Sequence, residues 1–137
     1  MDSREVAIAT NGRRGVFDLT DACRTFVDEV GKGRSGLLHV FAPHATAGVV
    51  AMELGSGSEA DLLASIDRLL PRDDRWRHAH GSPGHGADHV LPALISPSLS
   101  VPVIDGQLGL GTWQSIAMVD PNPDNPRRRI RLTFMPG

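Results

Sequence analysis

The sequence predicts an α+β fold, in which mixed or antiparallel sheet layers combine with a few helices in a single compact domain. Three observations lead to this prediction. Short apolar runs rich in strand-forming residues recur along the 137 residues. Two other segments have the apolar spacing of amphipathic helices. No repeat, low-complexity tail or linker divides the chain, so we expect residues 1–137 to form one domain with a substantial core.

The N-terminal segment predicts a hairpin followed by a helix. Glu5 to Thr10 and Gly15 to Leu19 are predicted strands, and Asn11-Gly12 between them is a typical two-residue hairpin turn. Thr20 is a candidate N-cap for the helix, which two glycines end after residue 30. The apolar face of this helix consists of Ala22, Cys23, Phe26, Val27 and Val30.

The middle of the chain predicts two buried strands and a second helix. Ser35 to Ala42 and Thr46 to Leu54 are continuous apolar runs, which suit strands covered on both faces and favour helices packed over a sheet. Ser58 to Asp61 is a predicted capping box, and Pro71 ends the helix that follows. Asp61 is therefore either a helix-start residue or a functional acid. The helix face is formed by Leu62, Leu63, Ile66, Leu69 and Leu70.

The C-terminal third predicts short strands separated by turns. Asp105-Gly106 is a strong hairpin signal, and Asp120 to Pro126 is a proline-rich loop. From Arg127 to Phe134, charged or polar residues alternate with apolar ones, which is the pattern of a half-buried strand. The predicted strands are Leu99 to Ile104, Leu108 to Leu110, Thr112 to Val119 and Arg128 to Met135.

Composition and charge argue against several classes of protein. A formal net charge of −2 and a pI near 6.3 give no electrostatic reason to expect nucleic acid or a membrane as a partner. The single cysteine, Cys23, excludes an internal disulfide and suits a small buried apolar residue. No apolar run is long enough to cross a bilayer, and the first residues lack a signal-peptide pattern. We therefore expect a cytoplasmic protein.

Four of the six histidines lie between His78 and His89, in a segment broken by glycine and proline. Crowded imidazoles indicate a metal site or a proton-transfer site, although some of these side chains could simply be solvated. Ala87 to Ile95 is a predicted short helix with Asp88 as its cap. His85 and His89 would face one point only if that helix began earlier.

Three further groups carry residues suited to chemistry. These are Pro43 to Thr46 with Glu53, the glycine-rich stretch Gly109 to Gln114, and the arginines from Arg127 to Arg131. Together with the histidines they could form a site for a metal and an anion, because guanidinium groups match phosphate geometry. Each also has a structural alternative. Glu53 could end a strand in solvent, Trp113 could belong to the core, and the arginines could form a solvated strand face.

At these residues the chain resembles a known family. The segments PHATAGVVAMEL, WRHAH…HGADHV, SLSVPVIDGQLGLGTWQSIAM and RRRIRLTF, in this order, are similar to the YjbQ family, from about residue 36 to the end. The resemblance implies a compact α+β domain that forms a homotrimer, with metal-binding residues near the subunit interfaces. It also implies a weak secondary thiamine-phosphate synthase activity, which joins hydroxymethylpyrimidine diphosphate to thiazole phosphate and releases pyrophosphate.

The resemblance assigns roles residue by residue. His44 matches the histidine of the HxT motif, and His78 and His89 match the paired histidines, so we expect these three to bind a divalent metal, most simply zinc, with one position open. Mg²⁺ is the alternative for a diphosphate substrate. The expected catalytic residues are Glu53, Asp61 and Gln114. The expected substrate-binding residues are Thr46, Trp113, Arg128 and Arg129.

The chain also departs from the family pattern. Relatives tend to have Asn or Asp a few residues before the second histidine, where this chain has His85-Gly86-Ala87, and His80 lies where an aromatic or another residue is common. These departures leave the metal site plausible and put the choice of substrate in doubt. The leading hypothesis is a metal-assisted enzyme that acts on a phosphorylated small molecule. The alternatives are a non-catalytic trimer that binds a metal or an anion, and a metal-dependent phosphoester hydrolase.

Overall fold

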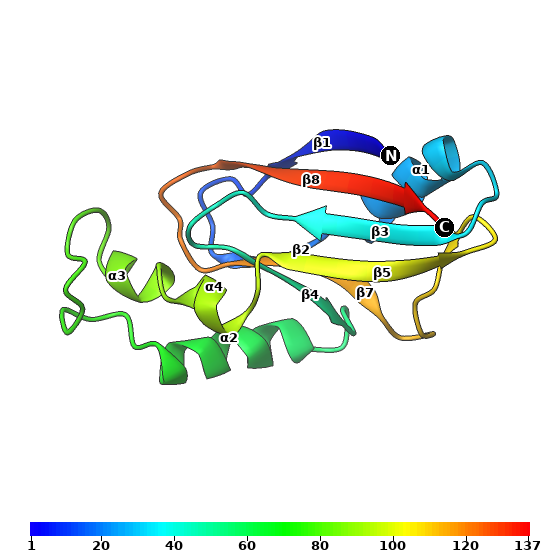
Figure 1. Ribbon diagram of the computed structural model, residues 1–137. Coiled ribbons are helices and arrows are strands. Elements are labelled where there is room, and N and C mark those ends of the chain that lie inside the picture. Colours follow the sequence, from blue (N-terminus) through cyan, green and yellow to red (C-terminus); the bar gives the residue numbers. More distant parts are fainter.

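The computed structural model describes residues 1–137, which form two antiparallel β-sheets with helices around them (Figure 1). The five-stranded sheet has the order β1-β8-β3-β5-β6, formed by Asp2–Ala9, Arg127–Pro136, Gly36–Phe41, Ser98–Ile104 and Gln107–Leu108. The three-stranded sheet has the order β2-β7-β4, formed by Gly15–Asp18, Ser115–Asp120 and Gly48–Met52. The helices are α1 (Thr20–Gly31), α2 (Ser58–Leu69), α3 (His85–Asp88) and α4 (Leu91–Leu94). The predicted α+β class is confirmed, and every strand pair is antiparallel.

The main core lies between the two sheets and α1. Ile130, Leu132 and Phe134 alternate along β8 and point into this core, where α1 contributes Phe26 and Val27. The alternation predicted for the last strand is therefore confirmed. Because side chains two positions apart share a face, the same register also directs the Arg128 side chain inward, where it is only 7% exposed.

A second, smaller core covers the other face of the three-stranded sheet. Ile66 and Leu70, at the end of α2, pack with Ala87 and Leu91 against Val119 of β7. Figure 1 shows α2, α3 and α4 together on this side of the molecule. Since Met118 belongs to the main core and Val119 to the second, β7 is buried on both faces.

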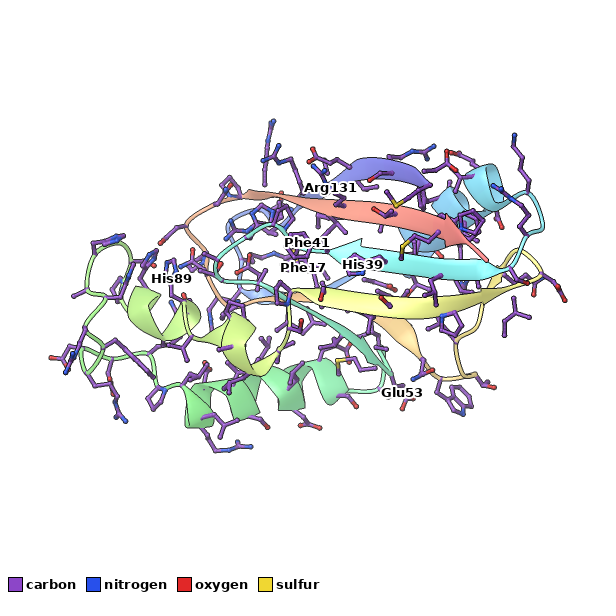
Figure 2. The ribbon with its side chains drawn as sticks, in the orientation of Figure 1. Phe17, His39, Phe41, Glu53, His89 and Arg131 are labelled. Carbon is purple, nitrogen blue, oxygen red and sulfur yellow. The ribbon has the colours of Figure 1, made fainter.

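The five-stranded sheet differs from the expectation that its strands would be covered on both faces. Leu38 and Val40 of β3 are buried, whereas Leu37, on the opposite face of the same strand, is 44% exposed. The outer face carries polar and charged side chains such as His39 and Arg131 (Figure 2). The prediction that Ser35 to Ala42 is covered on both faces is therefore wrong for the single chain, because α1 packs on the inner face of this sheet and the outer face stays exposed.

The predicted N-terminal hairpin is also wrong. Asn11 and Gly12 have φ values of 56° and 69°, as a tight turn requires, but the strands on either side belong to different sheets. β1 pairs with β8 and β2 pairs with β7. The turn is held instead by the Thr10 amide, which donates to the Pro126 carbonyl at 2.9 Å. By contrast, Asp105-Gly106 forms the predicted hairpin, with Ile104 opposite Gln107.

The predicted helix caps are replaced by other contacts. Thr20 is the first residue of α1, where its amide donates to Asp18 Oδ1 at 2.9 Å and its hydroxyl accepts from the Ile116 amide of β7. The capping box predicted at Ser58 to Asp61 does not form, because α2 already begins at Ser58. Glu59 instead accepts a hydrogen bond from the Gly55 amide at 2.9 Å. None of the helices has both the length and the apolar character needed to cross a membrane.

Candidate metal centre

The histidine-rich segment folds into a loop over α3 and brings four imidazoles together. The His78 ring centroid lies 4.2 Å from that of His80, 5.0 Å from that of His85 and 4.3 Å from that of His89. One ring nitrogen from each of His78, His80 and His85 lies within 4.8 Å of the other two. This arrangement of side chains from a loop and a short helix is the candidate metal centre. We call these four residues the histidine cluster.

The helix under the loop begins earlier than predicted. The single helix expected from Ala87 to Ile95 is instead two short helices, and α3 begins at His85. His89 therefore lies one turn after His85, and the two Nε2 atoms are 2.8 Å apart. The cap predicted at Asp88 is wrong as well, since its carboxylate is buried and paired with Arg72.

Two glycines allow this close packing. Gly84, just before α3, has a φ of +81°, which is the left-handed region that glycine adopts most easily. A Cβ at Gly86 would clash with the His78 carbonyl oxygen and lie 2.5 Å from Trp76 Cβ. The glycines that made a helix start at His85 doubtful from the sequence are thus the residues that let the loop lie directly on the helix.

His85 is oriented by a carboxylate. Its Nδ1 lies 2.9 Å from Asp124 Oδ2 and 3.1 Å from the Asn122 side-chain nitrogen. An Nδ1–H that donates to Asp124 leaves the Nε2 lone pair directed at His89. This pairing of a carboxylate with the far side of an imidazole is how metal-binding histidines are commonly held in one tautomer and orientation.

A buried polar network lies behind the cluster. Asn122, which is 3% exposed, donates from its side chain to Asp88 Oδ2 at 3.0 Å, while its main-chain amide donates to Asp120 Oδ1 at 3.0 Å. Asp88 pairs with Arg72, and Asp120 pairs with Arg128 at 2.5 Å. Two buried ion pairs are thus joined through one asparagine, which ties the histidine cluster to the end of β7.

The surroundings of His78 and His89 favour the neutral form of these two side chains. Burial lowers the pKa of His78 and of His89, and the neighbouring histidines lower both further. The Ser82 side chain and the hydrogen bond from His85 keep the pKa of Asp124 below its ordinary value. Neutral imidazole is the form that binds metals, so the lowered pKa values of His78 and His89 favour metal binding by these two side chains.

His44 lies in a different polar group. Its Nε2 accepts a hydrogen bond from the Arg129 amide at 2.9 Å, and its pKa is lowered by burial and by the charge of Arg128. Thr46, close by in sequence, donates to Asp120 Oδ1 at 3.1 Å and accepts from Arg128. His78 and His89 of the predicted metal triad thus contact one another, while the ring nitrogen of His44 is already hydrogen-bonded to β8.

The other predicted site residues are spread over the chain. The Arg129 side chain is 64% exposed and lies 3.6 Å from Glu5, and Trp113 is 75% exposed rather than part of the core. Gln114 accepts a hydrogen bond from the Gly111 amide and closes its own turn. Glu53 accepts from the Ser56 hydroxyl beyond the end of β4, and Asp61 is exposed on α2. Figure 2 shows Glu53 and His89 on opposite sides of the molecule.

A pocket of about 320 Å³ opens beside the histidines. Its wall includes His78, His80 and His85 together with Arg72 and Ser82, and few of its residues are apolar. Sequence analysis singled out the histidines but missed Arg72, Asn122 and Asp124. The only signal for the last two was their place in the loop Asp120 to Pro126, where Asn and Asp are also ordinary turn residues.

The donor set fits a nitrogen-preferring metal. Zinc binds histidine at about 2.0–2.1 Å, so two nitrogens of a tetrahedral site lie roughly 3.3 Å apart. The nitrogen–nitrogen separations within the cluster are 2.8 Å between His85 and His89 and up to 4.8 Å among His78, His80 and His85, so they bracket that distance. Mg²⁺ prefers oxygen ligands, so Mg²⁺ would depend on oxygens brought by a diphosphate.

Fold and site together define a two-sheet α+β domain with a histidine cluster at one end of its smaller sheet. The family model described as "UPF0047 protein YjbQ-like" matches residues 4–137, and the chain belongs to this family. It is 57% identical to a UPF0047 protein of Mycobacterium tuberculosis over 137 residues, which is 100% of both chains. It is 31% identical to the UPF0047 protein YugU of Bacillus subtilis, covering 98% of each chain.

Solved structures show the same fold. A hypothetical protein from Aeropyrum pernix superposes with a TM-score of 0.89 at 30% identity and 100% coverage of both chains. An uncharacterized conserved protein of the same family from Clostridium acetobutylicum superposes with a TM-score of 0.85 at 27% identity, covering 96% of this chain and 99% of that one. The resemblance to the YjbQ family is therefore confirmed at the level of family and fold.

Proposed function

We propose that this protein is a metal-dependent enzyme that acts on phosphorylated small molecules, as a thiamine-phosphate synthase. In this reaction it joins hydroxymethylpyrimidine diphosphate to thiazole phosphate and releases pyrophosphate. The observation that carries the proposal is the convergence of His78, His85 and His89 beside a polar pocket, with Asp124 orienting one of them.

A bound zinc ion would act as a Lewis acid and stabilise negative charge on phosphate oxygens. The chain's own residues would hold that ion and set its surroundings. Asp124 accepts a hydrogen bond from His85 Nδ1–H and orients the ring, while the pair of Arg72 and Asp88 anchors the loop and the helix. Because the pocket wall is formed by the same loop, a ligand in the pocket would lie next to the imidazoles.

The arginines take separate roles in this proposal. Arg128 is satisfied by Asp120 and Thr46, so its role is to hold the end of β7 and β8 in place. Arg129 is exposed and paired only loosely with Glu5, so its guanidinium is free to bind a phosphate. Burial, and then the charge of Arg128, lower the pKa of His44, which favours a neutral imidazole at this position.

We also propose that the enzyme is a homotrimer in the cytoplasm. Glu53 and His89 lie on opposite sides of one chain, so these two residues can share a site only if they come from different chains. The uncovered outer face of the five-stranded sheet offers a surface for such an assembly. In a trimer, Glu53, Asp61, Trp113 and Gln114 of one chain would complete the site at the histidine cluster of another.

Turnover tests the proposal. The zinc-loaded protein is incubated with hydroxymethylpyrimidine diphosphate and thiazole phosphate, and thiamine phosphate and pyrophosphate are measured. We expect His89→Ala to lose at least about 10-fold of the turnover, because loss of a ligand should cost more than loss of a partner that only orients one. His39→Ala, on the outer sheet face, is the matched control and should keep full turnover.

One observation favours a second candidate function. Four histidines are available in the cluster, and four protein ligands are typical of structural metal sites. A non-catalytic metal-binding trimer would show no turnover and would lose its fold when the metal is chelated. Release of inorganic phosphate from either substrate, without thiamine phosphate, would instead indicate a phosphoester hydrolase.

A further inference from the structure

The metal triad predicted from the sequence, His44, His78 and His89, leaves two members of the histidine cluster, His80 and His85, without an assigned role. We propose that His80 and His85 join His78 and His89 as ligands of one metal ion, and that His80 is the ligand which a phosphate group displaces. This inference rests on the proposed function, because it concerns the same metal. In the resting form the metal would have four imidazole ligands, and in the phosphate-bound form it would have three.

The geometry of the rings supports a shared ion. His78 and His85 lie at the centre of the cluster, with centroids 5.0 Å apart. His80 lies 4.2 Å from His78 and 5.1 Å from His85, and His89 lies 4.3 Å and 4.5 Å from the same two rings. The two outer rings, those of His80 and His89, thus lie at similar distances from the central pair, as expected if all four imidazoles approach one point from different sides.

His85 has the most constrained position of the four. Its side chain is 14% exposed, and it is the member of the cluster whose second ring nitrogen contacts a carboxylate. Asp124 and Asn122 both reach that nitrogen, and Asn122 is itself held by Asp88. A ring fixed in this way, with Nε2 directed into the cluster, has the features of a permanent metal ligand.

His80 has the opposite surroundings. It is exposed, and it precedes Gly81, whose φ of +86° gives the chain a sharp turn there. Its contacts in the cluster are with the rings of His78 and His85 alone. His80 lies in the wall of the pocket, so a phosphate that enters the pocket reaches the position of this side chain. His78 also lies in the loop, but its ring contacts three others, whereas that of His80 contacts two, so His80 is the ligand that can leave with the least disturbance.

This ligand set also predicts which metals the site selects. Four neutral nitrogens suit Zn²⁺, Co²⁺, Ni²⁺ and Cu²⁺, whereas Mg²⁺ and Ca²⁺ prefer oxygen. The one carboxylate in contact with the cluster, that of Asp124, is engaged with His85. We therefore expect the free protein to bind Co²⁺ and Zn²⁺ and to leave Mg²⁺ unbound.

Cobalt absorption spectroscopy on the full-length protein tests this inference, because the visible bands of Co²⁺ report the number and type of ligands. We expect Asp124→Asn to weaken Co²⁺ binding by about 10- to 100-fold through loss of orientation, and His85→Ala, which removes a ligand, by at least about 100-fold. The controls are His39→Ala and Asp21→Asn, whose side chains lie outside the cluster; that of Asp21 is fully exposed.

The role of His80 is tested by the absorption spectrum of bound Co²⁺ as well as by the affinity for Co²⁺. We expect His80→Ala to keep Co²⁺ bound but with shifted, weaker bands. Adding inorganic phosphate to the wild-type protein should move its spectrum toward that of the variant. A His80→Ala spectrum identical to wild type, or wild-type bands unchanged by phosphate, would overturn this inference and leave the proposed function standing. Absence of any Co²⁺ binding by the wild type would overturn both.

Discussion

Arg128 and Arg129 are neighbours on β8, but their side chains have opposite surroundings. The strand alternation turns Arg128 into the interior, where it bonds Asp120 and Thr46. Arg129 points outward and is 64% exposed. Both were expected to bind substrate, because sequence shows two adjacent guanidinium groups but not which of them already has a buried partner.

A pair of substitutions separates these two roles. Asp120→Ala leaves the Arg128 charge buried without a partner, so we expect the free energy of unfolding to fall by about 3–5 kcal/mol. Arg129→Ala removes an exposed group from a loose ion pair and should change the free energy of unfolding by less than about 1 kcal/mol. Urea unfolding followed by circular dichroism measures both. Equal losses in the two variants would contradict the assignment of Arg128 to the interior.

The candidate site shows how far individual residues could be predicted. His78 and His89 were chosen because they match the paired histidines of the family motif, and their rings do lie together. His85 could not be placed, because the helix that positions it starts between two glycines and is held by tertiary contacts. Asn122 and Asp124 look like turn residues in the sequence, and their role becomes visible only when the loop meets α3.

At the scale of elements, the pairing of β1 with β8 places opposite charges across the sheet. Glu5 lies opposite Arg131, and their side chains form an ion pair of 2.5 Å. The hydrogen bond from Arg131, and then the charges of Arg129 and Arg131, hold the pKa of Glu5 below 4.5. Since this carboxyl group has a lower pKa in the folded state, its ionised form stabilises the fold.

This pairing predicts a pH dependence for Glu5→Gln. The stability that the ionised Glu5 contributes is fully present above its unfolded pKa of about 4.5 and is lost as the pH falls through the lower folded value. Wild type should therefore be more stable than the variant at about pH 6, and the difference should shrink toward zero at about pH 3. Thermal melts of both proteins across this pH range measure the difference in stability. A difference that stays constant with pH would rule out this role for the ion pair.

Two turns show why some elements were predicted and others were not. Asn11-Gly12 and Asp105-Gly106 both adopt positive φ values, as expected for their residue types. The strands around Asp105-Gly106 pair with each other, whereas those around Asn11-Gly12 join separate sheets. Local sequence determines the turn itself, but the partner of each strand depends on which strands arrive from the rest of the chain.

At the scale of the whole molecule, the candidate residues fall into separate groups. The histidine cluster lies beside α3, His44 and the arginines lie at the start of β8, and Glu53 lies beyond β4 (Figure 2). The buried network through Asn122 and Asp120 joins the first two groups within one chain. In the proposed homotrimer, Glu53 of one chain would join the first two groups of another chain only when the chains assemble.

The central claim is that the histidine cluster holds a metal ion. Elemental analysis after exhaustive dialysis, on the wild type beside the double variant His78→Ala with His89→Ala, tests it most directly. We expect about one zinc-like metal ion per chain in the wild type and in the His39→Ala control, and almost none in the double variant. A wild-type protein without metal, or a double variant that keeps it, would contradict the account.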